Sequence, residues 1–129
     1  MMGPGGMNMG KFVIRKVDSG VKFDLKAGNG EVIATSEVYD SHASCVKGVE
    51  SVRKIACAGK IEDLTAPGKP LTNPKIEVYE DKRGAFRFRL KARNGQIVAV
   101  SEGYTTHAAC LDGVESVCRN APIAPTEEE

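Results

Sequence analysis

One segment of the sequence occurs twice, and this internal repeat limits the possible folds more than any other feature. Residues 26–52 return as residues 91–117, shifted by 65 positions. Both copies contain Lys-Ala-x-Asn-Gly, Ala-x-Ser-Glu-x-Tyr, His-Ala-x-Cys and Gly-Val-Glu-Ser-Val in the same order. Self-similarity at a fixed offset indicates one supersecondary unit in two copies. We therefore expect a fold of two related halves.

The first repeat, residues 11–64, has the pattern of three strands, a helix and a short last strand. Apolar and polar residues alternate over 11–17 and 21–27, and 31–36 contains consecutive apolar residues. Asn29-Gly30 supplies the residues of a type I′ hairpin between the second and third strands. Asp40-Ser41 offers an N-cap for a helix with an apolar stripe at 45, 49, 52 and 56 and with Arg53 on its outer side. Residues 60–64 fit a fourth strand.

The second repeat, residues 75–121, follows the same plan after a proline-containing linker at 65–74. Its hairpin is expected at Asn94-Gly95, and Thr105 or Thr106 is expected to cap its helix. No copy of the short strand at 60–64 is expected after it, and residues 122–129 are predicted to form a disordered acidic tail. Residues 1–10 are predicted to be a second disordered tail. The compact domain is expected to span residues 11–121.

A single β-β-β-α unit of this size covers the apolar face of a three-stranded sheet with only one helix, which is marginally stable. Two units solve this problem if they cover each other around a pseudo-twofold axis, as in an isologous dimer fused into one chain. We therefore predict an α+β fold of two tandem β-β-β-α(-β) repeats, with an antiparallel sheet and both helices on one face. The chain is expected to be a monomer with an internal pseudo-dimer.

Composition and charge exclude several classes of protein. The sequence has 18 Lys and Arg against 17 Asp and Glu, so no global basic field is available to collect nucleic acid. The start of the chain lacks the features of an export signal, and no apolar run approaches the about 18 residues of a membrane span. The four cysteines are expected to be reduced thiols. These features predict a cytoplasmic protein without a membrane partner.

The repeated motifs resemble those of the YegP-like family, a set of small bacterial proteins of unassigned function. The resemblance is carried by residues 25–39 and 48–52, and by 86–96, 101–104 and 113–117 in the second copy. It implies two β-β-β-α-β units that merge into one sheet with their last strands exchanged. Residues 60–64 fit such a last strand and residues 123–129 do not, which leaves the symmetry of the exchange open. The resemblance implies no activity, cofactor or catalytic residue.

His-x-x-Cys occurs once in each repeat, as His42 with Cys45 and as His107 with Cys110. At this spacing both side chains lie on one face of a helix, and two such pairs brought together by the pseudo-twofold axis would bind Zn²⁺ tetrahedrally. The favoured interpretation is that both cysteines are small core residues and both histidines are exposed. We therefore predict no metal and no cofactor.

The strand after residue 85 carries a row of basic residues on one face, and the first repeat carries a shorter row that Asp24 interrupts. Such a row on an open sheet can contact phosphates. Glu31, Glu77 and Gln96 on neighbouring strands offer cross-strand partners instead, and a solvated sheet face is the favoured interpretation. The candidate binding residues are Arg87, Arg89, Lys91, Arg93, Lys22 and Lys26.

Two further repeated features lie at the helices. Ser-Glu-x-Tyr stands before each helix, where a structural tyrosine packed beneath the helix is a commoner use of these groups than acid–base chemistry. Gly48 and Gly113 in mid-helix indicate a close approach of helix backbone to a neighbour.

The sequence thus predicts a small non-catalytic binding module with an unidentified protein partner. The alternative is a nucleic-acid or polyanion binder that uses the basic strand face. No enzymatic activity is expected, because no paired nucleophile and base accompany these motifs.

Overall fold

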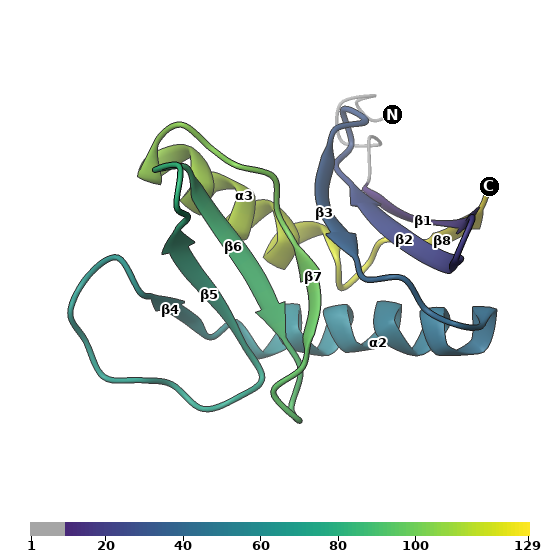
Figure 1. Ribbon diagram of the computed structural model, residues 1–129, viewed down its shortest axis with the longest axis horizontal. Coiled ribbons are helices and arrows are strands. Elements are labelled where there is room, and N and C mark those ends of the chain that lie inside the picture. Colours follow the sequence, from purple (N-terminus) through teal and green to yellow (C-terminus); the bar gives the residue numbers. More distant parts are fainter. Residues whose placement is uncertain (1–9) are drawn as a thin grey trace, which may run out of the picture.

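The computed structural model describes residues 10–129, which form a sheet of eight strands with two helices (Figure 1). The first repeat contains β1 Lys11–Val17, β2 Gly20–Lys26, β3 Val32–Ser36, α2 His42–Ala58 and β4 Ile61–Asp63. The second repeat contains β5 Lys75–Glu80, β6 Phe86–Lys91, β7 Ile97–Val100, α3 His107–Asn120 and β8 Thr126–Glu128. Because the order of elements is the same in both repeats, the predicted α+β fold of tandem repeats is confirmed.

The two repeats join at the centre of the sheet, whose strand order is β4-β5-β6-β7-β3-β2-β1-β8. The three meander strands of each repeat are antiparallel, and β3 pairs antiparallel with β7. At this junction Thr35 lies opposite Val100, its own equivalent 65 positions later. A pseudo-twofold axis therefore passes between these two residues, as in an isologous contact.

Each hairpin between the second and third strands is at the predicted place but has another turn type. The N–H of Gly30 donates to the carbonyl of Ala27 at 2.9 Å, and only the glycine has positive φ, at 89°. The ladder between β2 and β3 shifts register beside Lys26. This is the form in which a turn is followed by a left-handed glycine and a bulge, so the type I′ prediction is wrong.

The last strand of each repeat lies at the outer edge of the other repeat. β4 runs parallel to β5, with Ile61 opposite Ile76, and β8 runs parallel to β1, with Thr126 opposite Phe12. The exchange is therefore symmetric. The prediction of a disordered tail at 122–129 is wrong, because the compact domain continues through the buried Ala124 to β8 instead of ending at residue 121.

Arg53 on α2 explains why this acidic segment is ordered. Its Nη1 donates to the carbonyl oxygens of Ala121 (3.1 Å) and Ala124 (2.7 Å), and its Nη2 donates to the hydroxyl of Thr126 (3.0 Å). The guanidinium also lies 4.9 Å from the centroid of the Phe12 ring. A cation is favourable at the carbonyls that end a helix. Arg53 is consequently half-buried, although its place on the outer side of the helix predicts exposure.

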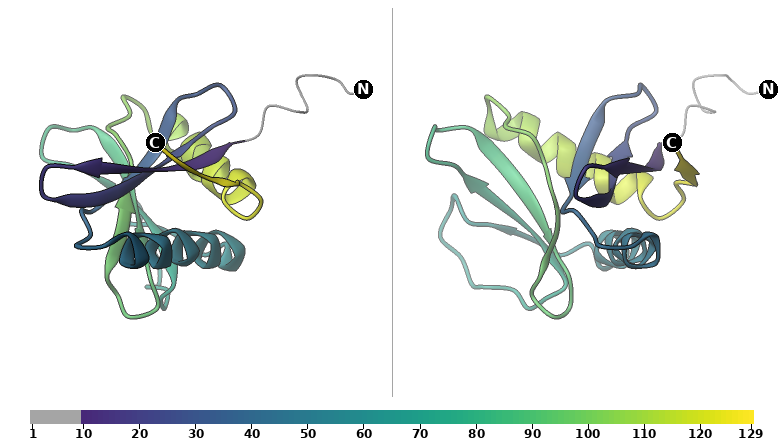
Figure 2. Two further views of the ribbon diagram at one scale, coloured as in Figure 1. Left: turned by 90° about the vertical axis from the view of Figure 1, so that its right-hand side faces the viewer. Right: turned by 45° about the vertical axis from the view of Figure 1, so that its right-hand side comes forward.

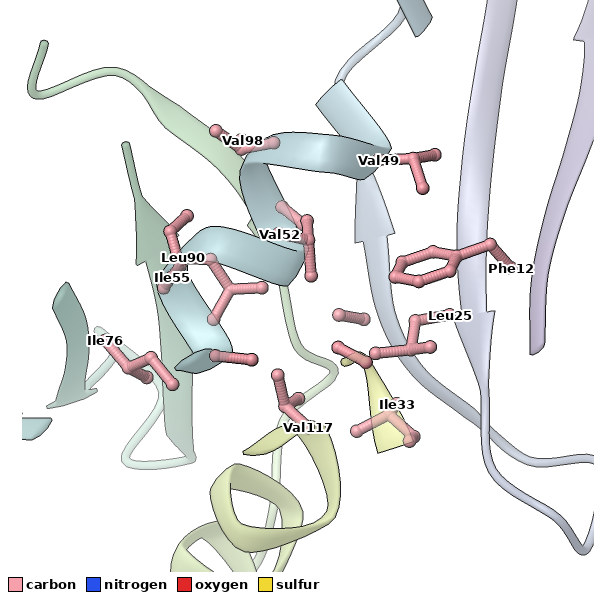
Figure 3. Close-up of a cluster of buried hydrophobic side chains, with 14 of the residues drawn as sticks. Phe12, Leu25, Ile33, Val49, Val52, Ile55, Ile76, Leu90, Val98 and Val117 are labelled. Atoms are coloured by element: carbon pink, nitrogen blue, oxygen red, sulfur yellow. The ribbon is translucent and has the colours of Figure 1, made fainter. Parts of the chain in front are cut away.

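Both helices lie on the same face of the bent sheet (Figure 2). α2 packs against β2 of its own repeat and against β5, β6 and β7 of the other, while α3 packs against β3 as well as β5 and β6. Val52 and Ile55 of α2 and Val117 of α3 are buried between the two halves of the sheet (Figure 3). Each repeat therefore covers apolar surface of the other.

Hydroxyl side chains begin both helices, as predicted. Ser41 Oγ accepts from the N–H of Ser44 at 3.1 Å, and Thr106 Oγ1 accepts from the N–H of Ala109 at 3.1 Å. In the part of the chain that the structure describes, neither helix is both long and apolar enough to cross a membrane.

The tail predicted at residues 1–10 falls mostly on residues 1–9, which lie outside the described residues. Gly10 is described and is buried, and its N–H donates to Asn120 Oδ1 at 3.2 Å. A Cβ at this position would lie 2.6 Å from the carbonyl oxygen of Lys26. The packed part of the described chain therefore includes Gly10 and does not begin at residue 11.

Candidate functional site

Three of the six predicted binding residues lie on one strand, β6: Arg87, Arg89 and Lys91. The alternation of the strand turns Phe88 and Leu90 into the core and the basic residues to the face opposite the helices. Arg87 Nε lies 2.8 Å from Asp81 Oδ2 in the turn after β5. Arg87, at one end of the row, is thus already paired with a carboxylate.

Glu77 on β5 pairs with the other two cations of the row, Arg89 and Lys91. The sheet register places Glu77 opposite Arg89, whose Nε lies 2.7 Å from Glu77 Oε1, and Lys91 Nζ lies 3.7 Å from the other oxygen. Burial acts to raise the pKa of Glu77, but hydrogen bonds from Arg89 and Lys75 outweigh burial and hold that pKa below its usual value. The predicted cross-strand role of Glu77 is confirmed.

From Glu77, a network of alternating positive and negative side chains continues across β5 to β4. Lys75 Nζ lies 3.1 Å from Glu77 Oε2 and 2.6 Å from Glu62 Oε1, and it donates to the carbonyl of Leu71 at 2.9 Å. The side chains of Lys75 and Glu77 are only 9% and 7% exposed. Because breaking so buried a pair is costly, this network serves to fix three neighbouring strands to one another.

The other three predicted residues lie away from the row. Arg93 is in the hairpin between β6 and β7, whereas Lys22 and Lys26 are on β2. β2 is separated from β6 by β7 and β3. The structure therefore does not bring the six predicted residues together into one basic surface.

Both cysteines of the His-x-x-Cys motifs are core residues. Cys45 and Cys110 have no exposed surface and His42 is exposed, which confirms the favoured interpretation for these residues, but His107 is half-buried beside Phe86 instead of exposed. Burial raises the pKa of Cys110 to about 11, and the negative charge of Asp63 acts in the same direction. Its thiol is therefore protonated at neutral pH and is a poor nucleophile. Within residues 10–129, no three His, Cys, Asp or Glu side chains are grouped as metal ligands, and all four cysteines are free.

The histidines of these motifs fasten the exchanged strands. His42 Nε2 lies 2.8 Å from Glu128 on β8, and His107 Nε2 lies 2.7 Å from Asp63 on β4. Asp63 and Glu128 are themselves 65 positions apart. Each pair thus connects the start of a helix to the last strand of the other repeat, a contact that sequence reasoning missed.

The Ser-Glu-x-Tyr motif builds the junction between sheet and helix. Ser36 Oγ accepts from the N–H of Phe23 at 2.9 Å and donates to the carbonyl of the next residue at 2.7 Å. The Tyr39 ring stacks on Phe23, and its hydroxyl lies where a Cβ on Gly48 would collide with it. Burial raises the pKa of Tyr39. The second repeat has the same arrangement, so the predicted close approach at both mid-helix glycines is confirmed.

A surface that sequence reasoning missed lies at the β4 edge of the sheet. Residues 64–74 leave β4, arch outward and return to β5 (Figure 1). A cavity of about 360 Å³ lies between this loop and β4, and Ile61, Leu64 and Leu71 line it while being 42%, 44% and 36% exposed. We call this surface the β4 groove. Exposed apolar side chains gathered in one place are typical of an interaction site. In the sequence, apolar residues around a proline-containing linker are a signal for the β4 groove. Their pattern does not indicate whether the side chains are exposed or buried.

Comparisons with known proteins agree with this architecture. A family model described as a domain of unknown function, DUF1508, matches residues 18–63 and 81–128, so its second match includes β8. A UPF0339 protein of Pseudomonas aeruginosa is 39% identical over 120 residues, which cover 92% of this chain and 96% of that protein. A UPF0339 protein of Treponema denticola is 56% identical over 54 residues, which cover 42% of this chain and 93% of the relative. That relative is therefore about one repeat long.

The solved structures show the same fold. The solution structure of yegP from Escherichia coli, described as a protein of unknown function, superposes with a TM-score of 0.78 at 33% identity. The match covers 94% of this chain and 93% of that chain.

Proposed function

The chain belongs to the UPF0339 (DUF1508, YegP-like) family of unknown function, and from this premise we propose that it is a non-catalytic binding module of the cytoplasm. In this proposal the β4 groove takes up an extended apolar segment of a partner protein as an additional strand. The observation that carries the proposal is the presence of open backbone groups and exposed apolar side chains on the same edge.

At its outer edge, β4 keeps the backbone groups of Ile61 open, while the carbonyl of Asp63 accepts from the N–H of Ala66 at 3.3 Å. The carbonyl of Lys60 and the N–H of Leu64 both bond to β5, each at 2.8 Å. Since alternate residues of a strand turn to opposite edges, Ile61 directs its N–H and carbonyl away from β5. An extended peptide can pair with the free groups of Ile61 while its apolar side chains contact Ile61, Leu64 and Leu71 in the cavity. Glu62, Asp63 and Lys69 also line this cavity.

The opposite edge of the sheet supports the assignment by contrast. β8 ends the sheet there with Thr126, Glu127 and Glu128, all exposed, and charged edge strands discourage pairing with another chain. β8 occupies the same structural place as β4 without any large apolar residue. The exposed Ile61 and Leu64 are therefore not required by the fold, which favours a role in binding.

The groups that could carry chemistry are engaged in structural contacts, and this supports a non-catalytic role. The thiols of Cys45 and Cys110 are buried, and the Tyr39 hydroxyl packs on helix backbone. Each histidine is paired with a carboxylate of an exchanged strand. The four free cysteines suit a reducing compartment such as the cytoplasm.

Polyanion binding is the weaker alternative. Arg87, Arg89 and Lys91 have carboxylate partners, which lowers the charge that they offer to phosphate. Lys22, Lys26 and Arg93 remain, in two separate parts of the sheet. This function is therefore treated as a second outcome of the same test.

The test uses a displayed library of extended peptides of about six residues, with binding followed by backbone amide shifts of the full chain. We expect saturable shifts at residues 60–71 for peptides with alternating apolar side chains. Ile61→Pro removes the outward N–H and leaves the ladder to β5 intact, so it should weaken binding at least about tenfold. Leu64→Asp should weaken binding similarly by replacing one of the apolar contacts of the cavity with a charge.

The matched control is Ile123→Asp, because Ile123 is 65% exposed and lies outside the β4 groove. This variant should bind the peptides as the wild type does. Equal binding by Ile61→Pro and Leu64→Asp would overturn the proposal. Binding of single-stranded nucleic acid that is lost in a Lys22→Glu, Lys26→Glu variant would favour the alternative.

A further inference from the structure

A second cavity, of about 510 Å³, lies between α2 and the hairpin that joins β6 to β7. We propose that it binds a small phosphomonoester whose organic part carries hydroxyl groups. This inference is independent of the β4 groove and goes beyond the function proposed above. The volume is that of typical small-molecule sites. The lining residues on which the argument rests are Ser51, Lys54, Ile55, Asn73, Pro74 and Arg93.

Two cations without partners line this cavity. Lys54 comes from α2 of the first repeat and Arg93 from the hairpin of the second. Within residues 10–129, neither makes an ion pair; Arg83 and most lysines are also unpaired, so what distinguishes Lys54 and Arg93 is that both line one cavity. Two unpaired cations on one small cavity favour a doubly charged anion, and arginine with lysine is a common pair for phosphate.

The rest of the lining suits an organic part with hydroxyl groups. Asn73 Oδ1 is buried and accepts no hydrogen bond from the part of the chain that the structure describes, so the cost of removing it from water is uncompensated. This oxygen has almost no accessible surface, so a rotation of the Asn73 side chain is needed before a hydroxyl donor on a ligand in the cavity can satisfy it. Ile55 and Pro74 provide an apolar surface beside it. The cavity thus combines cationic, hydrogen-bonding and apolar contacts in one place.

The pseudo-twofold axis supplies an internal comparison. An equivalent cavity of about 280 Å³ lies at the other hairpin and is lined by Asn29 and Ser116, the counterparts of Asn94 and Ser51. It contains Glu31 and Asp112 and no basic residue. The counterpart of Lys54 is Arg119, which pairs with Glu115 at 2.9 Å, and the counterpart of Arg93 is Gly28. The other repeat therefore forms the same fold with one paired cation and no second cation at this place, which favours a ligand as the reason for the unpaired Lys54 and Arg93.

The full chain titrated with glycerol 3-phosphate, followed by backbone amide shifts at about 0.15 M salt, tests the proposal. We expect saturable shifts confined to residues 51–55, 73–74 and 92–94, and none with glycerol. Lys54→Ala and Arg93→Ala should each weaken binding at least about tenfold. Asn73→Ala should weaken binding of glycerol 3-phosphate but leave the weaker binding of inorganic phosphate unchanged.

Lys47→Ala is the matched control, because Lys47 is an exposed lysine on the same helix outside the cavity. It should bind glycerol 3-phosphate as the wild type does. Equal weakening by Lys47→Ala, shifts centred elsewhere or a failure of glycerol 3-phosphate to saturate the cavity would each overturn the proposal. None of these results bears on the peptide site, whose test uses other residues.

Discussion

Replacement of Arg53 with Ala is expected to release the C-terminal strand and to lower the free energy of unfolding by about 3.5 kcal/mol. Its guanidinium donates to the carbonyls of Ala121 and Ala124 at 3.1 and 2.7 Å, and each hydrogen bond from a charged donor contributes about 1.5 kcal/mol. Its position 4.9 Å from the centroid of the Phe12 ring adds about 0.5 kcal/mol. For a chain of this size, the loss corresponds to a fall in Tm of roughly 10 °C.

Individual amides report the release directly. The N–H of Phe12 donates to the segment before β8 and the N–H of Glu129 donates to β1, both at 2.8 Å. In Arg53→Ala both amides should exchange with deuterium much faster than in the wild type. The N–H of Ile76, which bonds to the segment leading into β4 at the other edge, should keep its protection.

Arg119→Ala is the control, because its pair with Glu115 is exposed and should contribute less than about 0.5 kcal/mol. Chemical denaturation measures the free energy of unfolding of both variants. If Arg53→Ala also lies within about 0.5 kcal/mol of the wild type and its β8 amides stay protected, the reasoning about the C-terminal strand is refuted.

Three further variants test the interior. Lys75→Met should lower the free energy of unfolding by about 3 kcal/mol, measured by urea denaturation, because it leaves the half-buried carboxylate of Glu62 without its cation and removes one of the cations that pair with the buried Glu77. Glu77→Gln should be less stable than the wild type at pH 7, and the difference should vanish on acidification. The pKa of the Glu77 carboxyl is lower in the folded chain than in the unfolded chain, where it is about 4.3, so the carboxylate stabilises the folded state at pH values above about 4.3. This stabilisation is lost as the pH falls through the folded pKa. A difference that persists at pH 2 contradicts this assignment. Gly48→Ala should lower the Tm because its Cβ collides with the Tyr39 hydroxyl, and adding Tyr39→Phe should restore part of the loss.

Local sequence patterns were sufficient for most of the fold. Ser41 predicts the start of a helix, Asn29-Gly30 predicts the place of a hairpin, and the mid-helix Gly48 predicts a close contact that Tyr39 makes. The repeat then predicts the pseudo-twofold arrangement, because a single unit has too little core of its own. These features depend on residues that are near one another in the sequence.

The predictions from the sequence are wrong where contacts between residues far apart in the sequence determine the structure. Residues 126–128 carry no apolar alternation, and they are ordered by pairing with β1 and by Arg53, which is more than 70 positions away. The repeat nevertheless contained a signal, since Asp63 and Glu128 stand at the same offset of 65 as the rest of the repeat. Likewise, the alternation of the β5 strand predicts solvated polar residues, whereas Lys75 is buried because the loop at Leu71 covers it.

The cavity between α2 and the hairpin is built from both repeats, and the β4 strand of the β4 groove is held in the sheet by β5 of the second repeat, so the account depends on the claim that neither repeat holds its interior alone. Thermal unfolding combined with sedimentation of the isolated residues 10–64 tests that claim most directly. We expect the fragment to be unfolded as a monomer, or to fold only as a dimer whose Tm rises with protein concentration. A monomeric fragment that unfolds cooperatively with the stability of the whole chain would contradict the shared interior.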